Sequence, residues 1–354
     1  MSASAITNSG RGILVVGNFL SVKGMPGACE GLSDNLEQKG WRVTRTSSKL
    51  SRLARLSDML VASGSKRSRY TVAAIEVYSG LAFSWAEIVC LVLRLMGKPY
   101  VLTLHGGGLA DFARRWPRRV RQLLRSAEAV TTPSVFLQNS LRSVREDILY
   151  LPNALDLERY PFRLRANPLP RLCWLRSFHA IYNPTLAVKT LALLAADFPA
   201  IKLNMTGPDK GDGSLEAVSR LADELALEEN IEITGAIAKS EVPRRMAEYD
   251  IFLNTTDYES FGISVMEAAV SGMCIVTTNV GELPYLWKDG HDALLVPPDD
   301  AEAMAAAVRR ILTEPGLAER LSRNARRKAE QFDWSVILPQ WESVLSSVAG
   351  EGTK

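Results

Sequence analysis

Short, uninterrupted apolar runs recur along the first half of the chain, and each is followed by a loop and a longer segment of mixed polarity. Such runs are typical of strands buried on both faces of a parallel sheet, and the segments between them have helical length. The predicted strands are residues 12–17, 41–44, 98–105, 127–133 and 148–153, and the predicted helices include 28–39 and 134–143. The alternation of strand and helix indicates a doubly wound α/β domain.

A proline-bearing segment at residues 154–170 interrupts this alternation, which then begins again. The second set of predicted strands is 171–175, 201–207, 231–235, 250–254 and 274–278, with late helices at 301–312 and 317–331. A chain of 354 residues is long enough for two cores. We therefore expect two Rossmann-like α/β domains, 1–165 and 166–330, facing across a ligand cleft, and a C-terminal helix and tail, 331–354, that packs back toward the first domain.

The most informative stretch reads Asp257-Tyr-Glu-Ser-Phe-Gly-Ile-Ser-Val-Met-Glu267 and lies between two predicted strands. A strand, a turn and a helix place a ligand at the helix N-terminus, whose free N–H groups favour anions. Two carboxylates, Glu259 and Glu267, bracket that helix start, and a carboxylate can accept paired hydrogen bonds from vicinal hydroxyls. A nucleotide-sugar would satisfy both features. The alternative is a glutamate in the N-cap region and a second one on a solvated helix face.

Two loops of the first domain carry further candidate residues. His105 ends a predicted strand and is followed by three glycines, which remove packing partners and favour contact with a ligand. Gly24 lies in a loop after the first strand, where its backbone could approach a ligand closely. That loop lacks the Gly-x-Gly-x-x-Gly pattern, which argues against a nicotinamide or flavin site.

Charge is distributed unevenly along the chain. The formal net charge is +3, but the first half is basic and the second half is acidic. Basic side chains concentrate at 49–69 and in the arginine cluster of Arg114, Arg115, Arg118, Arg119 and Arg121. These are either solvated helix faces or a surface for anionic lipid headgroups or a phosphate-bearing acceptor. Nucleic acid is disfavoured because the remainder is acidic and carries no recognition motif.

Cysteine usage and the chain's start bear on location. The four cysteines lack the spacing of a metal site and are predicted to be buried thiols of a reducing compartment. No signal peptide is apparent, and the apolar patch at 81–96 is interrupted by Glu87 and Arg94, which makes it too short and charged to span a bilayer. We expect a cytoplasmic protein, peripheral on the inner face of the plasma membrane if the basic surface binds lipid.

The chain resembles retaining glycosyltransferases of family 4 (glycosyl transferases group 1), which have the GT-B fold. The resemblance covers residues 13–344, and its most specific part is the Glu-x7-Glu pattern from Glu259 to Glu267. Supporting matches are the segments 151–159, 280–284, 289–290 and 294–299. It implies that the first domain takes the acceptor and the second the nucleotide-sugar donor.

The resemblance also implies roles for single residues. Glu267 would bind the donor ribose, Glu259 the transferred sugar, and His105 would lie beside that sugar. Arg176 would neutralise the diphosphate, together with the Gly24 loop and the helix start at Gly262, Ile263 and Ser264. No metal and no cofactor are implied. The substrates would be a UDP- or GDP-sugar and a hydroxyl of a glycan or lipid-linked acceptor, as in cell-surface polysaccharide or glycolipid synthesis.

The sequence departs from the family pattern in two places. Residues 177–183 lack the lysine that usually follows the strand-end arginine, and His179 or Tyr182 could replace it. Glu282 stands where the family has a glycine, so it either alters which sugar fits or faces solvent. These departures leave two alternatives open: a phosphorylase or epimerase on the same fold, and a non-catalytic binding partner.

Overall fold

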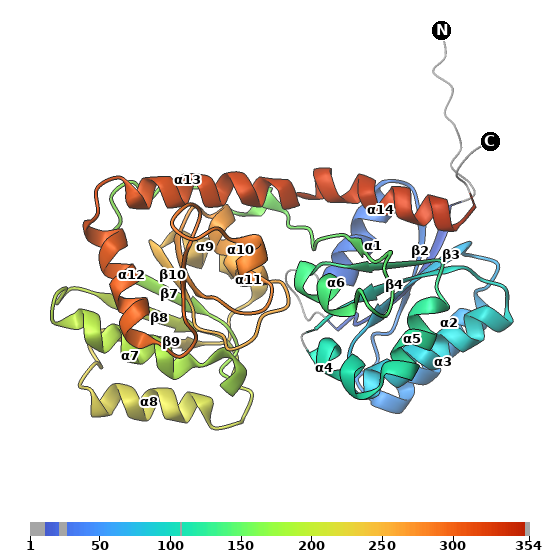
Figure 1. Cartoon of the computed structure of the whole chain (residues 1–354), viewed down its shortest axis with the longest axis horizontal. Coiled ribbons are helices and arrows are strands. Elements are labelled where there is room, and N and C mark those ends of the chain that lie inside the picture. The colour runs from blue at the N-terminus through green and yellow to red at the C-terminus, as the bar shows by residue number, and fades with distance from the viewer. Residues whose placement is uncertain (1–10, 21–26, 107, 351–354) are drawn as a thin grey trace, which may run out of the picture. The chain divides into compact units, whose positions relative to one another are not determined.

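A computed structural model describes residues 11–20, 27–106 and 108–350 (Figure 1). Contacts divide the chain into two compact units, Met1–Ala154 with Trp334–Lys354, and Leu155–Asp333. The chain passes from the first unit to the second after Ala154, before the predicted boundary at residue 165. Tyr160 and Arg165, which lie in between, form hydrogen bonds with residues of the second unit. The closing helix belongs with the first unit, where Trp41 Nε1 donates to Glu342 Oε1 at 3.1 Å.

The first unit is built on a parallel sheet whose six described strands have the order β2-β1-β3-β4-β5-β6. The strands are β1 (Gly12–Val16), β2 (Arg42–Thr46), β3 (Val72–Val77), β4 (Tyr100–Leu104), β5 (Ala129–Thr132) and β6 (Leu149–Tyr150). The helices are α1 (Ala28–Gln38), α2 (Arg52–Ser65), α3 (Leu81–Leu95), α4 (Gly108–Arg115), α5 (Pro117–Arg125), α6 (Val135–Leu141) and α14 (Trp334–Val348).

Both faces of this sheet are covered, as the apolar runs predict. Alternate residues of β1 point to opposite faces. Leu14 and Val16 join the core formed with α2 to α6, whereas Ile13 and Val15 join the core formed with α1 and α14. β1 is therefore buried on both sides, as are β3 and β4, which accounts for the lack of polar alternation in these strands.

The second unit repeats this architecture with the described strand order β12-β11-β10-β7-β8-β9, again parallel. The strands are β7 (Arg171–Leu175), β8 (Lys202–Thr206), β9 (Ile231–Gly235), β10 (Ile251–Asn254), β11 (Cys274–Thr278) and β12 (Leu294–Val296). The helices are α7 (Pro184–Ala195), α8 (Ser214–Glu224), α9 (Val242–Ala247), α10 (Ile263–Val270), α11 (Leu283–Leu286), α12 (Ala301–Thr313) and α13 (Leu317–Ala329). In Figure 1, α7 lies between α8 and α12, and α10 packs against α13.

The predicted fold class, two doubly wound α/β units, is confirmed. Sequence analysis missed β3, a central strand, because Val72-Ala-Ala-Ile-Glu-Val77 is rich in alanine and contains a charge, both of which lower strand propensity. An apolar stripe of leucines and a methionine in residues 48–63 would be expected to face the core, but its first two members do not. Leu50 and Leu53 are 86% and 80% exposed, since α2 begins only at Arg52 and its inward face begins later, at Met59.

The described residues show the state of the cysteines, the arrangement of possible metal ligands and the character of the helices. All four cysteines are buried and unpaired. Within the described ranges, no set of three or more acidic, histidine or cysteine side chains is arranged to hold a metal ion. No helix in the described part of the chain combines the length and apolar character needed to cross a bilayer.

The segment that enters the second unit is anchored by Arg165, whose side chain is fully buried. Its guanidinium donates to the carbonyl oxygens of Ser271, Tyr249 (2.8 Å) and Met246 (3.3 Å), and its Nε lies 3.6 Å from the Asp250 carboxylate. Burial lowers the pKa of Arg165 to about 10, with the nearby Arg163 charge adding to the effect. This one side chain connects the segment before β7 to the loop after α9 and to the end of α10.

We predict that Arg165→Met lowers the free energy of unfolding by about 3 kcal/mol, because it leaves several buried carbonyl oxygens without a donor and removes a buried cation beside Asp250. Arg163→Met is the matched control, since Arg163 also contacts Asp250, at 2.8 Å, but is half-exposed. It should cost under about 1 kcal/mol. Urea denaturation of the two variants measures the difference, and equal losses would contradict the assignment.

Candidate active site

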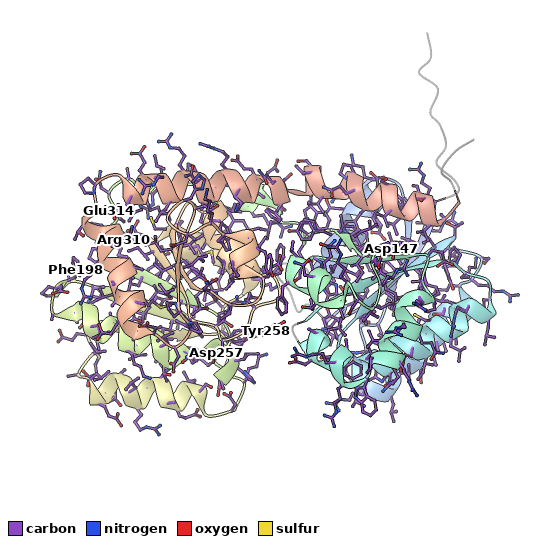
Figure 2. All side chains as sticks on the ribbon, viewed as in Figure 1. Asp147, Phe198, Asp257, Tyr258, Arg310 and Glu314 are labelled. Carbon is purple, nitrogen blue, oxygen red and sulfur yellow. The ribbon has the colours of Figure 1, made fainter. Side chains whose placement is uncertain are left out.

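The candidate site of the second unit lies where its strand order reverses, between β7 and β10. Loops at the carboxyl ends of two such strands diverge to opposite faces of the sheet and leave a crevice for a ligand. Arg176 directly follows β7, and the loop after β10 carries Asp257, Tyr258 and Glu259; Figure 2 labels the first two of these. The fold thus brings together side chains that are far apart in sequence.

Arg176 and Glu259 form a buried ion pair. The Nη2 atom of Arg176 donates to Oε2 of Glu259, and the guanidinium also lies 3.4 Å from Oδ1 of Asn254. The ring of Tyr182 stacks against the guanidinium, with 5.1 Å between the carbon Cζ and the ring centroid. Tyr182 therefore contacts the arginine and orients it by a cation–π interaction.

The loop that carries Glu259 holds the carboxylate from the other side. Its Oε1 atom accepts the N–H groups of Ser260 (3.0 Å) and Phe261 (3.2 Å). The carbonyl of Glu259 in turn accepts the N–H of Glu282 at 3.0 Å. Glu282 is fully buried beside this loop. The interpretation that it faces solvent is therefore wrong, because the β11–α11 turn packs it against the Glu259 loop.

Helix α10 begins directly after this loop. Gly262, in the left-handed region at φ +90°, precedes Ile263 and lets the chain turn into the helix. The N–H groups of the first helical turn have no partner within the helix, so Ile263 and Ser264 present them at the helix start. Ser264 is buried, and its hydroxyl has no hydrogen-bond partner among the described residues. A buried hydroxyl without a protein partner at a helix N-terminus is a donor for a ligand or a water molecule.

Glu267 lies one turn further along α10 and is only 7% exposed. Its Oε1 accepts the hydroxyl of Tyr160 at 2.8 Å. Burial raises the pKa of Glu267 above its usual range, while the Tyr160 hydrogen bond and the charges of Lys239 and Arg176 act in the opposite direction. The alternative interpretation of Glu267 as a solvated helix residue is therefore wrong. Tyr160 was missed by sequence analysis, because nothing in the linker marks it as a partner of α10.

The segment after β7 contains no lysine. The two residues that could replace it, Tyr182 and His179, have different surroundings. Tyr182 contacts Arg176, as described above. His179 is partly exposed, and its Nε2 lies 3.8 Å from a carboxylate oxygen of Asp212. Gly24, the remaining residue predicted for the donor site, lies outside the described residues.

His105 belongs to the first unit, directly after β4, and is buried. Its Nε2 lies 3.5 Å from Oε1 of Glu76, and its ring stacks on that of Tyr78 with 5.3 Å between centroids. Burial lowers the pKa of His105, and the charge of Glu76 opposes this shift. The partners of His105 come from β3, which is not among the predicted strands, and from Tyr78, the residue directly after it. A single carboxylate near the end of an apolar run was the signal that could have identified Glu76.

The arginine cluster lies on two short helices and is not uniform. Arg115, Arg118 and Arg121 are exposed, and Arg114 is exposed but paired with Asp111. Arg119 is only partly exposed. Its Nε donates to Glu87 of α3 at 3.1 Å, and its Nη2 donates to Ser84 at 3.1 Å. Four of the five predicted residues are thus on the surface, and Arg119 joins α5 to α3.

Comparison with known proteins supports the likeness of the two units to sugar-transfer enzymes. The family described as "Glycosyl transferases group 1" matches residues 167–328, and "Glycosyltransferase Family 4" matches residues 77–159. A phosphatidyl-myo-inositol mannosyltransferase of Mycolicibacterium smegmatis is 27% identical over 220 residues, or 60% of this chain and 55% of that protein. A glycogen synthase of Mycobacterium tuberculosis is 26% identical over 262 residues, or 70% of this chain and 61% of that protein. The chain thus matches between half and two thirds of the length of each relative.

Solved structures show the same fold. Sucrose-phosphate synthase from Thermosynechococcus elongatus superposes with a TM-score of 0.78 at 18% identity, covering 97% of this chain and 100% of that one. HepE from Anabaena, in complex with UDP and glucose, superposes with a TM-score of 0.75 at 19% identity, covering 95% and 100%. At such identities the likeness establishes the fold alone.

We predict that Gly281→Ala disturbs the Glu259 loop. A Cβ atom at Gly281 would lie 2.0 Å from the carbonyl oxygen of Glu259, so the loop would have to move. Gly290→Ala is the matched control, because Gly290 also has a positive φ but open space around its Cβ position. Both variants carry backbone strain, and Gly281→Ala should lose about 1–3 kcal/mol more stability in urea denaturation. Equal losses would show that the loop tolerates displacement.

Proposed function

Because this chain belongs to the family 4 glycosyltransferases, glycosyl transferases group 1, we propose that it transfers a sugar from a nucleotide-sugar to a hydroxyl of a glycan or lipid-linked acceptor. The observation that carries the proposal is the arrangement around α10. An unpaired buried hydroxyl, free N–H groups, a guanidinium and two buried carboxylates meet at one helix N-terminus. Anion recognition and sugar-hydroxyl recognition are therefore combined in one crevice.

The donor diphosphate is assigned to the first turn of α10. The N–H groups of Ile263 and Ser264, with the Ser264 hydroxyl, would donate to its oxygens, and the helix dipole favours its charge. Arg176 lies beside this turn, where it holds Glu259. Its guanidinium has enough donors to keep that contact while it also binds a phosphate oxygen. The carboxylate of Glu259, held by two backbone N–H groups, stays in place for a hydroxyl of the transferred sugar.

The ribose is assigned to Glu267. Its carboxylate is buried and oriented by Tyr160, and vicinal hydroxyls can donate two hydrogen bonds to such a group. The Tyr160 hydroxyl contacts Oε1, and ribose hydroxyls would donate to the remaining lone pairs of the carboxylate. His105, in the first unit, is proposed to contact the transferred sugar. Glu282, buried next to the Glu259 loop, is proposed to restrict which sugar fits.

The proposed reaction is a displacement on one face of the sugar. The bond between the anomeric carbon and the diphosphate oxygen breaks, and a bond to the acceptor oxygen forms on the same face, which retains the anomeric configuration. The acceptor proton moves to the leaving phosphate oxygen. Arg176 and the α10 N-terminus stabilise the negative charge that develops on the diphosphate, so the proposal requires neither a metal nor a cofactor.

The alternative of a non-catalytic binding partner is supported by one observation, the absence of a lysine at 177–183. One experiment separates this alternative from sugar transfer. Thermal unfolding is measured with a panel of UDP, GDP and their sugars, since a ligand that binds only the folded state raises the melting temperature. Selective stabilisation by one nucleotide-sugar supports transfer, which is then assayed with that donor. The absence of any shift would favour the non-catalytic function.

We predict that Glu267→Ala weakens binding of the stabilising nucleotide-sugar by about 1–3 kcal/mol, because the ribose hydroxyls lose a buried partner. Glu302→Ala, which removes an exposed carboxylate from the first turn of α12, is the matched control and should leave affinity unchanged. Isothermal titration calorimetry measures both. An unaltered affinity of Glu267→Ala would remove the ribose assignment.

A membrane surface is the second part of the proposal. Four large apolar side chains on the outer face of α3 are exposed: Leu81, Ile88, Leu91 and Leu95. Arg94 lies on the same helix, and Arg118 and Arg121 lie on α5, which Arg119 joins to α3. An apolar helix face flanked by cations suits the interface of an anionic bilayer, where a lipid-linked acceptor would be presented. The inner face of the plasma membrane is therefore the proposed location.

We predict that Arg118→Glu combined with Arg121→Glu abolishes co-sedimentation with phosphatidylglycerol vesicles at low salt, since each reversal replaces attraction by repulsion. The control, Arg320→Glu combined with Arg323→Glu, makes the same charge change on α13 of the second unit and should bind as the parent does. Leu91→Ser combined with Leu95→Ser should also weaken binding if the apolar face inserts. Vesicle binding by the α5 variant equal to that of the parent would contradict this surface.

A further inference from the structure

The sheet of the first unit also reverses its strand order, between β1 and β3, and a buried polar group lies at this point. Glu76 is the penultimate residue of β3, and its side chain is only 9% exposed. The neighbouring strand β4 ends at Leu104, so His105 emerges at the same edge of the sheet. Both residues line one cavity, with Thr103 and Asn153 as further polar members. The pair therefore lies where a ligand of this unit would bind.

Contacts on three sides fix the Glu76 carboxylate. Its Oε1 lies 3.5 Å from Nε2 of His105, and its Oε2 accepts the hydroxyl of Tyr78 at 3.1 Å. Tyr78 also stacks on the His105 ring at an interplanar angle of 19°. Cys29 of α1 borders the same carboxylate, and Arg55 of α2 lines a second cavity together with Glu76 and Tyr78. The ring and its carboxylate partner are thus held by the same tyrosine.

Gly17, directly after β1, leaves the space that Glu76 occupies. A Cβ atom at this position would lie 2.8 Å from Oε2 of Glu76 and 2.9 Å from the sulfur of Cys29. The φ of Gly17 is not in the left-handed region, so the glycine is required by space and not by backbone conformation. Three strand ends, those of β1, β3 and β4, therefore combine to seat one carboxylate beside one imidazole.

We propose that Glu76 is a positioning residue for His105, and that its carboxylate holds the imidazole in the Nε2–H tautomer. The other ring nitrogen, Nδ1, is then the hydrogen-bond acceptor that His105 offers to a substrate hydroxyl. Which nitrogen carries the proton is set by the partner of the other one, and a carboxylate beside Nε2 selects Nε2–H. At 3.5 Å the carboxylate and the imidazole form a long contact, and contacts of this kind at catalytic sites can tighten when substrate binds.

These observations are explained less well if Glu76 and His105 form a pair that only stabilises the fold. Burial of a carboxylate is costly, and a neutral histidine in an apolar core could be satisfied by a carbonyl or a hydroxyl instead. Here the carboxylate is placed at a cavity wall beside a strand-end histidine. The role of His105 toward a sugar rests on the proposed function, whereas the tautomer and its dependence on Glu76 do not.

The test is NMR of the ring nitrogens in the full-length protein labelled with ¹⁵N-histidine. The chain has three histidines, so Glu76→Gln and Glu76→Ala can be compared with the parent once His105→Gln has assigned its signals. His179 and His291 belong to the second unit and serve as internal controls. Their unchanged signals would show that the effect is confined to the first unit, and an unchanged urea-unfolding midpoint would show that this unit remains folded.

Glu76→Gln removes the charge but keeps an oxygen acceptor. We expect the pKa of His105 to fall below that of the parent, because burial still disfavours the imidazolium and the opposing carboxylate charge is gone. The Nε2–H tautomer should persist. Glu76→Ala should release the tautomer preference as well, and Gly17→Ala, which displaces Glu76 without altering either partner, should shift the same signals. An unchanged tautomer in Glu76→Ala, or an unchanged pKa in Glu76→Gln, would overturn the proposal.

An activity measurement separates this proposal from the proposed function. With an identified donor and acceptor, we expect Glu76→Gln to lower kcat by about tenfold or more, with the acid limb of the pH–rate profile moved to lower pH. Altered His105 signals in a protein without transferase activity would retain the positioning role and reject the proposed function. Lost activity with unchanged His105 signals would mean that Glu76 contacts the substrate itself, which overturns the positioning role.

Discussion

The ion pair of Arg176 and Glu259 depends on β7 and β10 being neighbours in the sheet although they are not consecutive in the chain. Strand order reverses between them, so the loop after β7 and the loop after β10 leave the sheet toward opposite faces. The opening between the loops receives the guanidinium from one side and the carboxylate from the other. The β11–α11 turn approaches the Glu259 loop closely at Gly281. This contact fixes the loop directly before the start of α10.

The two buried carboxylates of this candidate site each have a defined partner, whereas within the described ranges the start of α10 does not. Glu259 is held by Arg176 and by two N–H groups, and Glu267 is held by Tyr160. The Ser264 hydroxyl and the first turn of α10 lack such partners among the described residues. Preorganised donors that cost nothing to orient at the moment of reaction are the main source of electrostatic stabilisation in enzymes. The reversal point of the first sheet follows the same rule with Glu76, His105 and Tyr78.

How far the sequence could predict this site depended on whether partners were close along the chain. The sequence predicts site roles for Glu259, the α10 start and Glu267 because they lie in one continuous motif with the periodicity of a strand, a turn and a helix. It predicts roles for Arg176 and His105 because each ends an apolar run. Tyr160 and Glu76 were not found, because their partners lie far away in the sequence, and β3 was not recognised as a strand because alanines and a glutamate weaken its pattern.

The sequence by itself determined the fold class, since runs of buried strands alternating with amphipathic helices can be satisfied only by parallel sheets covered on both faces. It also predicted which loops lie together, because carboxyl ends of parallel strands share one edge. Only the tertiary structure decided the partners: that Glu267 is buried against Tyr160, that Glu282 is buried, that Arg119 is paired, and that Glu76 faces His105. Local periodicity specifies which face of an element is buried, but the identity of the side chain across a contact depends on strand order and register, which are long-range properties.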